Sequence, residues 1–75
     1  MDDTDKPILE VIKDNLFTII HGLEHCYRIK NIGTYKSGLR ALDDYNGRYR
    51  KLTGRYYINE LEMLRYKDML KDLEQ

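Results

Sequence analysis

The chain has 75 residues and a formal net charge of zero, with 41% hydrophobic and 35% charged residues. This length provides one hydrophobic core and excludes a second domain, while the single cysteine, Cys26, excludes a disulfide within the chain. So small a core needs support, and a neutral chain does not repel a second copy of itself. We therefore expect one helical domain, residues 1–75, that forms a homodimer.

The first predicted helix spans residues 7–30. Asp5 and Pro7 favour a helix start here, because proline fits the first turn and a carboxylate is stabilised at the positive end of the helix dipole. Gly33 predicts the end, since glycine readily takes the left-handed conformation that closes helices. Between these points an apolar residue recurs every three or four positions. The set is Leu9, Ile12, Leu16, Ile19, Leu23 and Cys26.

The second predicted helix spans residues 35–53 and ends at Thr53-Gly54. Its apolar face consists of Tyr35, Leu39, Leu42, Tyr45, Tyr49 and Leu52. Asn46-Gly47 is also the favoured pair for a two-residue hairpin turn. The residues around it do not alternate at period two, however, and Gly47 falls on the polar face, so the helix is favoured.

The third predicted helix spans residues 57–73, with Asn59 and Glu62 as a possible capping box near its start. Its main apolar stripe is Met63, Tyr66, Leu70 and Leu73. Leu61 and Leu64 lie off this stripe, which predicts a helix that is apolar on two sides and touches two neighbours. The predicted fold is all-α: a small three-helix bundle or helical hairpin that dimerises through helical faces.

No constellation in the chain predicts catalysis. His21 and His25 flank Glu24 in the HxxEH pattern of inverted zinc proteases, but they fall on the polar face and no third histidine completes the site. Residues 43–47 resemble a calcium loop that lacks two of its ligands. The five glycines are scattered, so no phosphate-binding loop is present. We expect no catalytic residue, no metal, no cofactor and no small-molecule substrate.

Charge is distributed unevenly along the chain. Residues 28–57 carry eight cationic side chains and two carboxylates, and most of the seven tyrosines lie in the same stretch. Arginine and tyrosine are enriched at the hot spots of protein interfaces, and the same residue types neutralise phosphates and stack on bases. In a purely structural alternative, Tyr35, Tyr45 and Tyr49 belong to the core and the cations face solvent. Phe17, on the polar face of the first helix, is a further candidate anchor.

These observations predict a non-enzymatic module, such as a regulator, inhibitor or accessory subunit of phage or mobile-element type, that binds a larger protein partner. The candidate partner-binding residues are Phe17, Arg28, Arg40, Arg48, Tyr49, Arg50, Lys51, Arg55, Tyr56 and Tyr57. The alternative is a nucleic-acid-binding accessory protein that uses residues 48–57. The acidic N-terminal residues and the lack of a long apolar run predict a cytoplasmic protein with no membrane span.

Overall fold

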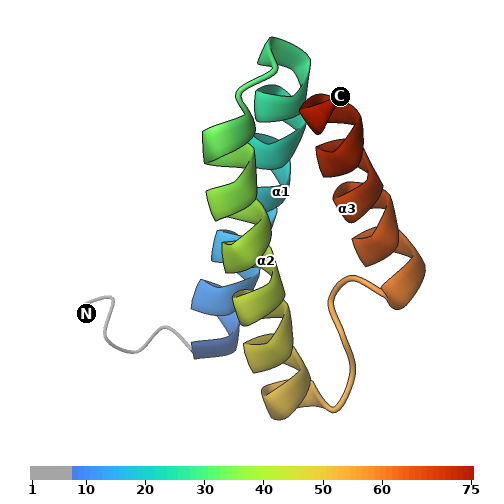
Figure 1. The fold of residues 1–75 in the computed structure, drawn as a ribbon. Coiled ribbons are helices and arrows are strands. Elements are labelled where there is room, and N and C mark those ends of the chain that lie inside the picture. The colour runs from blue at the N-terminus through green and yellow to red at the C-terminus, as the bar shows by residue number, and fades with distance from the viewer. Residues whose placement is uncertain (1–7) are drawn as a thin grey trace, which may run out of the picture.

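The computed structural model describes residues 8–75 and confirms the all-α prediction (Figure 1). Its three helices are α1, Ile8–Ile29, α2, Ile32–Thr53, and α3, Glu60–Glu74. The two long helices α1 and α2 form an antiparallel hairpin, and the shorter α3 lies beside it, with its end close to the turn of the hairpin (Figure 1). The predicted start of the first helix at residue 7 lies outside the described residues.

The turn between α1 and α2 differs from the prediction. Lys30, not Gly33, adopts the positive φ of 60° that ends α1. Asn31 then caps α2, because its side chain accepts a 3.1 Å hydrogen bond from the backbone N–H of Thr34. With Asn31 as N-cap, α2 begins at Ile32, and the predicted start at residue 35 is wrong by one turn.

The second helix is continuous through Asn46 and Gly47, so the prediction of a helix rather than a hairpin is confirmed. Its predicted end is also confirmed. Gly54 takes the left-handed conformation, φ 84°, and its N–H donates a 2.7 Å hydrogen bond to the carbonyl of Arg50.

The third helix begins later than predicted. Asn59 is its N-cap, as the capping-box pattern indicates, and accepts a 2.9 Å hydrogen bond from the N–H of Glu62. The helix itself starts at Glu60, and the preceding residues are not helical, so the predicted start at residue 57 is wrong. Tyr57 and Ile58 bond to a side chain of α2 instead, as described below.

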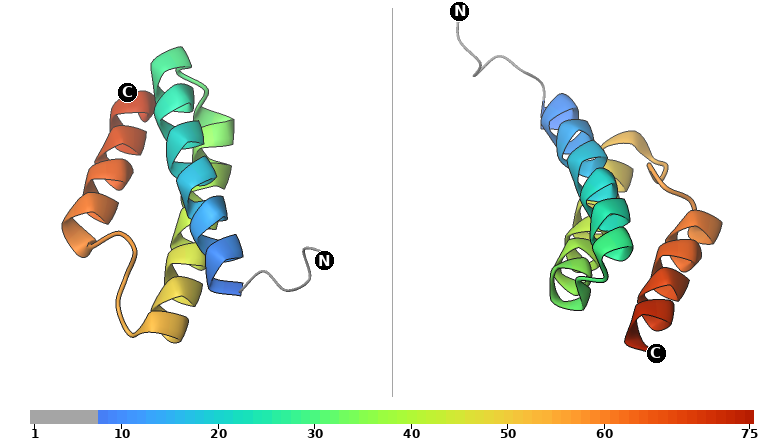
Figure 2. Two further views of the ribbon diagram at one scale, coloured as in Figure 1. Left: turned by 180° about the vertical axis from the view of Figure 1, so that it is seen from behind. Right: turned by 90° about the horizontal axis from the view of Figure 1, so that it is seen from above.

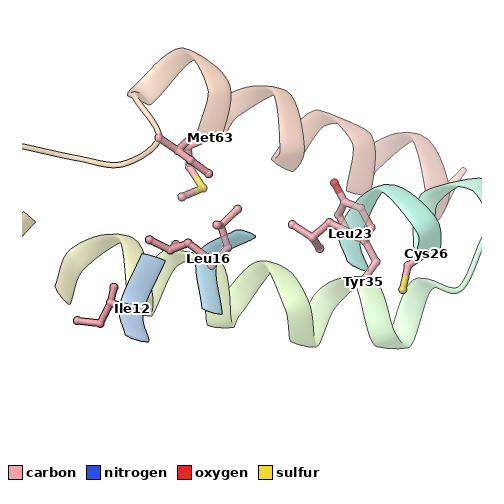
Figure 3. Packing of buried hydrophobic residues seen from close by; sticks show 8 residues of the cluster. Ile12, Leu16, Leu23, Cys26, Tyr35 and Met63 are labelled. Carbon is pink, nitrogen blue, oxygen red and sulfur yellow. The ribbon is translucent and has the colours of Figure 1, made fainter. Parts of the chain in front are cut away.

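The core lies between the hairpin and α3. Its buried residues are Ile12, Leu16, Leu23, Cys26, Tyr35, Leu42, Ile58 and Met63. The predicted apolar seam of the first helix supplies half of this set, and Met63 of α3 points toward Leu16 of α1 (Figure 3). Cys26 is a small buried core residue. Gly38 lets α1 and α2 approach closely, since a Cβ atom there would lie 2.9 Å from Cδ2 of Leu23.

Polar contacts fasten the C-terminal half of α3 to the hairpin. The Tyr35 hydroxyl donates a 2.7 Å hydrogen bond to the carbonyl of Tyr66, and burial raises the pKa of Tyr35 to about 12. The Tyr27 hydroxyl donates to Asp72 at 2.6 Å, and this hydrogen bond to a carboxylate raises the pKa of Tyr27. Nearer the C-terminus, Lys36 lies 3.2 Å from Glu74.

Candidate protein-interaction surface

The last two turns of α2 and the segment that follows bring together most of the predicted partner-binding residues. We call this the basic-aromatic surface. It consists of the exposed residues Arg48, Arg50, Lys51, Arg55, Tyr56 and Tyr57. Helical spacing places the first three around the end of α2, and Gly54 turns the chain so that the last three follow alongside.

The tyrosines divide between core and surface. Tyr35 is fully buried, whereas Tyr56 is 46% exposed. Tyr49, a predicted contact residue, is half-buried and packs edge-on against Tyr57 with 5.3 Å between ring centroids. The structural alternative therefore holds for Tyr35 and in part for Tyr45 and Tyr49, which are half-buried against the core, while Tyr56 and Tyr57 present aromatic surface to solvent.

Two arginines of the surface lie over aromatic rings. The guanidinium carbon of Arg50 is 5.0 Å from the centroid of Tyr56, and that of Arg48 is 5.2 Å from the centroid of Tyr45. Arg48 is also 3.2 Å from Asp44, so part of its charge is neutralised. Among residues 8–75, Lys51 and Arg55 form no side-chain ion pair, which leaves their positive charge open to a ligand.

Asn46 fixes the segment that carries Tyr56 and Tyr57. Its amide side chain is buried within the apolar face of α2, where it makes three hydrogen bonds. The Oδ1 atom accepts from the N–H groups of Tyr57 at 2.9 Å and Ile58 at 3.1 Å, and Nδ2 donates to the carbonyl of Ile58 at 3.1 Å. At the other end of the segment, the Thr53 hydroxyl accepts from the N–H of Arg55 at 3.3 Å.

The sequence pattern places Asn46 in a candidate hairpin turn and Thr53 at a helix end, and it predicts no contact between either residue and the segment after α2. A polar amide on an otherwise apolar helix face was the available signal for Asn46, because a buried polar group must find hydrogen-bond partners. The partners themselves lie beyond the end of α2, so periodicity within the helix does not identify them. The result is an ordered segment held at both ends.

A small depression of about 140 Å³ adjoins the surface on the side of α3. Tyr56, Ile58 and Met63 supply its apolar lining, and Asp43 and Glu60 supply carboxylates. The volume is below the several hundred Å³ typical of a small-molecule site.

Three predicted contact residues lie away from this surface. Arg28 is in the last turn of α1, beside the start of α2, and Arg40 lines a shallow groove between α2 and α3. Phe17 lies on α1, is 59% exposed, and packs against the ring of His21 with 4.3 Å between centroids. The ten predicted residues therefore do not form one continuous site.

His21 and His25 are exposed, as their place on the polar face predicts. Within residues 8–75, no three side chains of histidine, cysteine, aspartate or glutamate come close enough together to hold a metal ion. The HxxEH pattern thus has no third ligand in the described part of the chain.

Comparison with known protein families, with characterised proteins and with solved structures gives no match. Function is therefore inferred from the geometry and charge of the surface. In the part of the chain that the structure describes, no helix has the length and apolar character needed to cross a bilayer.

Proposed function

We propose that this protein is a non-enzymatic interaction module that docks onto a larger protein through the basic-aromatic surface. The observation that carries the proposal is the exposed pair of Arg50, on α2, and Tyr56, on the following segment that Asn46 holds in place. Lys51 lies beside this pair. In this role the protein acts as a regulator, inhibitor or accessory subunit and alters its partner by binding.

The residue types support protein recognition. Arginine and tyrosine supply a large share of hot-spot energy, because each combines an extended flat group with hydrogen-bond donors. An ordered segment also loses little conformational entropy on binding, so more of the contact energy remains as affinity. The preferred partner surface carries carboxylates to face Lys51 and Arg55, with an apolar side chain for the depression beside Tyr56.

Binding to single-stranded nucleic acid is the second candidate. It is favoured by Lys51 and Arg55, which have no carboxylate partner among the described residues and are therefore available to phosphates. Two features favour protein recognition over it. The ring of Tyr56 is already covered on one face by Arg50, and Asp43 and Asp44 lie close to the cations.

The test compares capture by three purified proteins from nuclease-treated extract of the source cells. The wild type is expected to retain a protein that the Arg50→Ala/Tyr56→Ala variant does not retain. Lys13→Ala removes a charge at a half-buried site on α1, where Lys13 pairs with Glu10, and serves as the control that is expected to bind like the wild type. Equal capture by wild type and double variant would refute the proposed surface.

Salt dependence separates the two candidates. If four cations of the surface contact phosphates, the affinity for a fluorescent single-stranded oligonucleotide falls with a log–log slope of about −3 in salt concentration. A protein complex centred on Tyr56 and the apolar depression is expected to change far less over the same range. Nanomolar binding to the oligonucleotide with that slope would replace protein recognition by the second candidate.

A further inference from the structure

The outer side of α3 is a second exposed face, separate from the basic-aromatic surface. The buried side of α3 carries Met63 and the half-buried Tyr66, Leu70 and Leu73. On the outer side, Leu61 is 77% exposed and Leu64 is 53% exposed. The prediction of a helix with apolar residues on two sides is therefore confirmed, and one of those sides has no covering element among residues 8–75.

Phe17 of α1 lies at about the same position along the helix axes as these leucines. The Tyr27–Asp72 hydrogen bond sets α1 and α3 side by side, and the two helices run in the same direction (Figure 2). Phe17 lies about three helical turns N-terminal to Tyr27 on α1, and Leu61 lies about three turns N-terminal to Asp72 on α3. The groove that Leu61 and Leu64 line also reaches Tyr27 of α1.

Charges of both signs accompany these apolar residues. Leu61 and Leu64 share a shallow groove along α3 with Arg65, Asp68 and Asp72. The side chains of Arg65 and Asp68 make no hydrogen bond or ion pair with any described residue. The residues that define the basic-aromatic surface carry only positive charge, and the carboxylates of Asp43 and Asp44 lie at its border.

We infer that this face binds a second copy of the same chain. A two-fold axis requires a patch that is complementary to itself. When two α3 helices pair antiparallel about an axis near their midpoint, Arg65 of each copy lies opposite Asp68 of the other, and the pairing occurs twice. Leu61 and Leu64 of both copies lose water around these pairs. The zero net charge of the chain leaves no long-range repulsion to oppose the contact.

The size of the face determines how tight the dimer is. α3 has 15 residues, so it is about 22 Å long, and with the flank of α1 the face is about 20 Å wide. Its area is thus below the roughly 800 Å² per partner of a standard stable interface. We therefore expect a weak dimer that dissociates on dilution. This inference is independent of the proposed function, because the two surfaces have no residue in common.

Sedimentation velocity over a concentration series from about 1 μM to 1 mM tests whether the chain dimerises through this face. The weight-average mass of the wild type is expected to rise from that of one chain toward that of two. Leu61→Glu/Leu64→Glu is expected to raise the dissociation constant at least about tenfold. Both positions are exposed and glutamate favours helix, so an unchanged circular dichroism spectrum confirms that the variant is folded. Leu52→Glu, at an equally exposed leucine near the end of α2, is the matched control and is expected to dimerise like the wild type.

Charge reversal then tests the antiparallel pairing. Arg65→Asp is expected to weaken the dimer several-fold, and the added Asp68→Arg exchange is expected to restore it, since the exchanged charges meet again across the axis. A wild type that stays monomeric throughout the series would overturn the inference. It would equally fail if the leucine variant and Leu52→Glu dimerised alike, or if the double charge exchange restored nothing.

Discussion

The hydroxyl group of Tyr35 donates a hydrogen bond of 2.7 Å to the backbone carbonyl of Tyr66, so a side chain from the first turn of α2 ends on the backbone of α3. Tyr35 itself is fully buried. Its ring packs in the core, and its hydroxyl binds α3 to the hairpin. A substitution that removes the hydroxyl alone separates these two contributions.

Tyr35→Phe removes the hydroxyl and keeps the ring. The free energy of unfolding is expected to fall by about 1 kcal/mol, because the buried hydrogen bond is lost and the carbonyl of Tyr66 retains only its helical bond. Urea denaturation at neutral pH measures the change. Tyr56→Phe, at an exposed tyrosine, is the control, and an equal loss there would show that the Tyr35 bond contributes nothing of its own.

Stability is expected to decline at alkaline pH. Burial raises the pKa of Tyr35 from 10.0 to about 12, so the unfolded chain loses this proton at lower pH than the folded chain does. The contribution of Tyr35 to stability is therefore fully present below pH 10.0 and is lost as the pH rises toward about 12. Urea midpoints across this range are expected to fall for the wild type and to fall less for Tyr35→Phe. Parallel curves for the two proteins would assign the decline to other groups.

Asn46→Ala removes the three hydrogen bonds that hold the segment before α3. The expected loss of stability is about 3 kcal/mol, because two N–H groups and one carbonyl are left without their partner. Hydrogen exchange gives the sharper measurement. The amides of Tyr57 and Ile58 are expected to be protected in the wild type and to exchange freely in the variant.

The control for this variant is Asn31→Ala, which removes the N-cap of α2 at the other end of the hairpin. Asn31→Ala is expected to lower the free energy of unfolding by about 1 kcal/mol. The amides of Tyr57 and Ile58 are expected to stay protected from hydrogen exchange. If both variants exposed these amides, the protection would come from global stability and not from Asn46.

Gly38→Ala and Gly47→Ala make the same change at two sites of α2 and are expected to act in opposite directions. At Gly47 no heavy atom lies within 4 Å of the added Cβ, so the better helix propensity of alanine raises stability by about 0.5–1 kcal/mol. At Gly38 the added Cβ lies 2.9 Å from the buried Leu23, and overpacking lowers stability by about 1 kcal/mol after the gain in propensity. Thermal denaturation of the pair measures both effects, and changes of equal sign would contradict the packing at Gly38.

Local sequence signals were sufficient for much of the fold. The apolar spacing of the first helix predicted Leu16 and Leu23 as core residues, and Gly54 and Asn59 were recognised as a helix end and a helix start because caps act within one turn. The start of α2 was missed. Gly33 was read as closing the first helix, whereas Lys30 takes the left-handed conformation and Asn31 begins the next helix.

Long-range contacts account for what the sequence could not reveal. Asn46 bonds to residues beyond the end of its own helix, and Tyr35 bonds to a carbonyl on another helix. The candidate site was predicted only in part for the same reason. Arg50 and Tyr56 meet because Gly54 turns the chain, whereas Phe17, although correctly predicted as exposed, belongs to a different face of the molecule.

The close fit of Leu23 at Gly38 also limits how the molecule can move. Sliding α2 along α1 by one turn would replace Gly38 with Thr34 or Leu42 at this point, and neither side chain fits where a single Cβ already lies too near. The close contact therefore fixes the register of α1 against α2. A ligand that docks at Tyr56 meets a hairpin whose two helices cannot slide past one another.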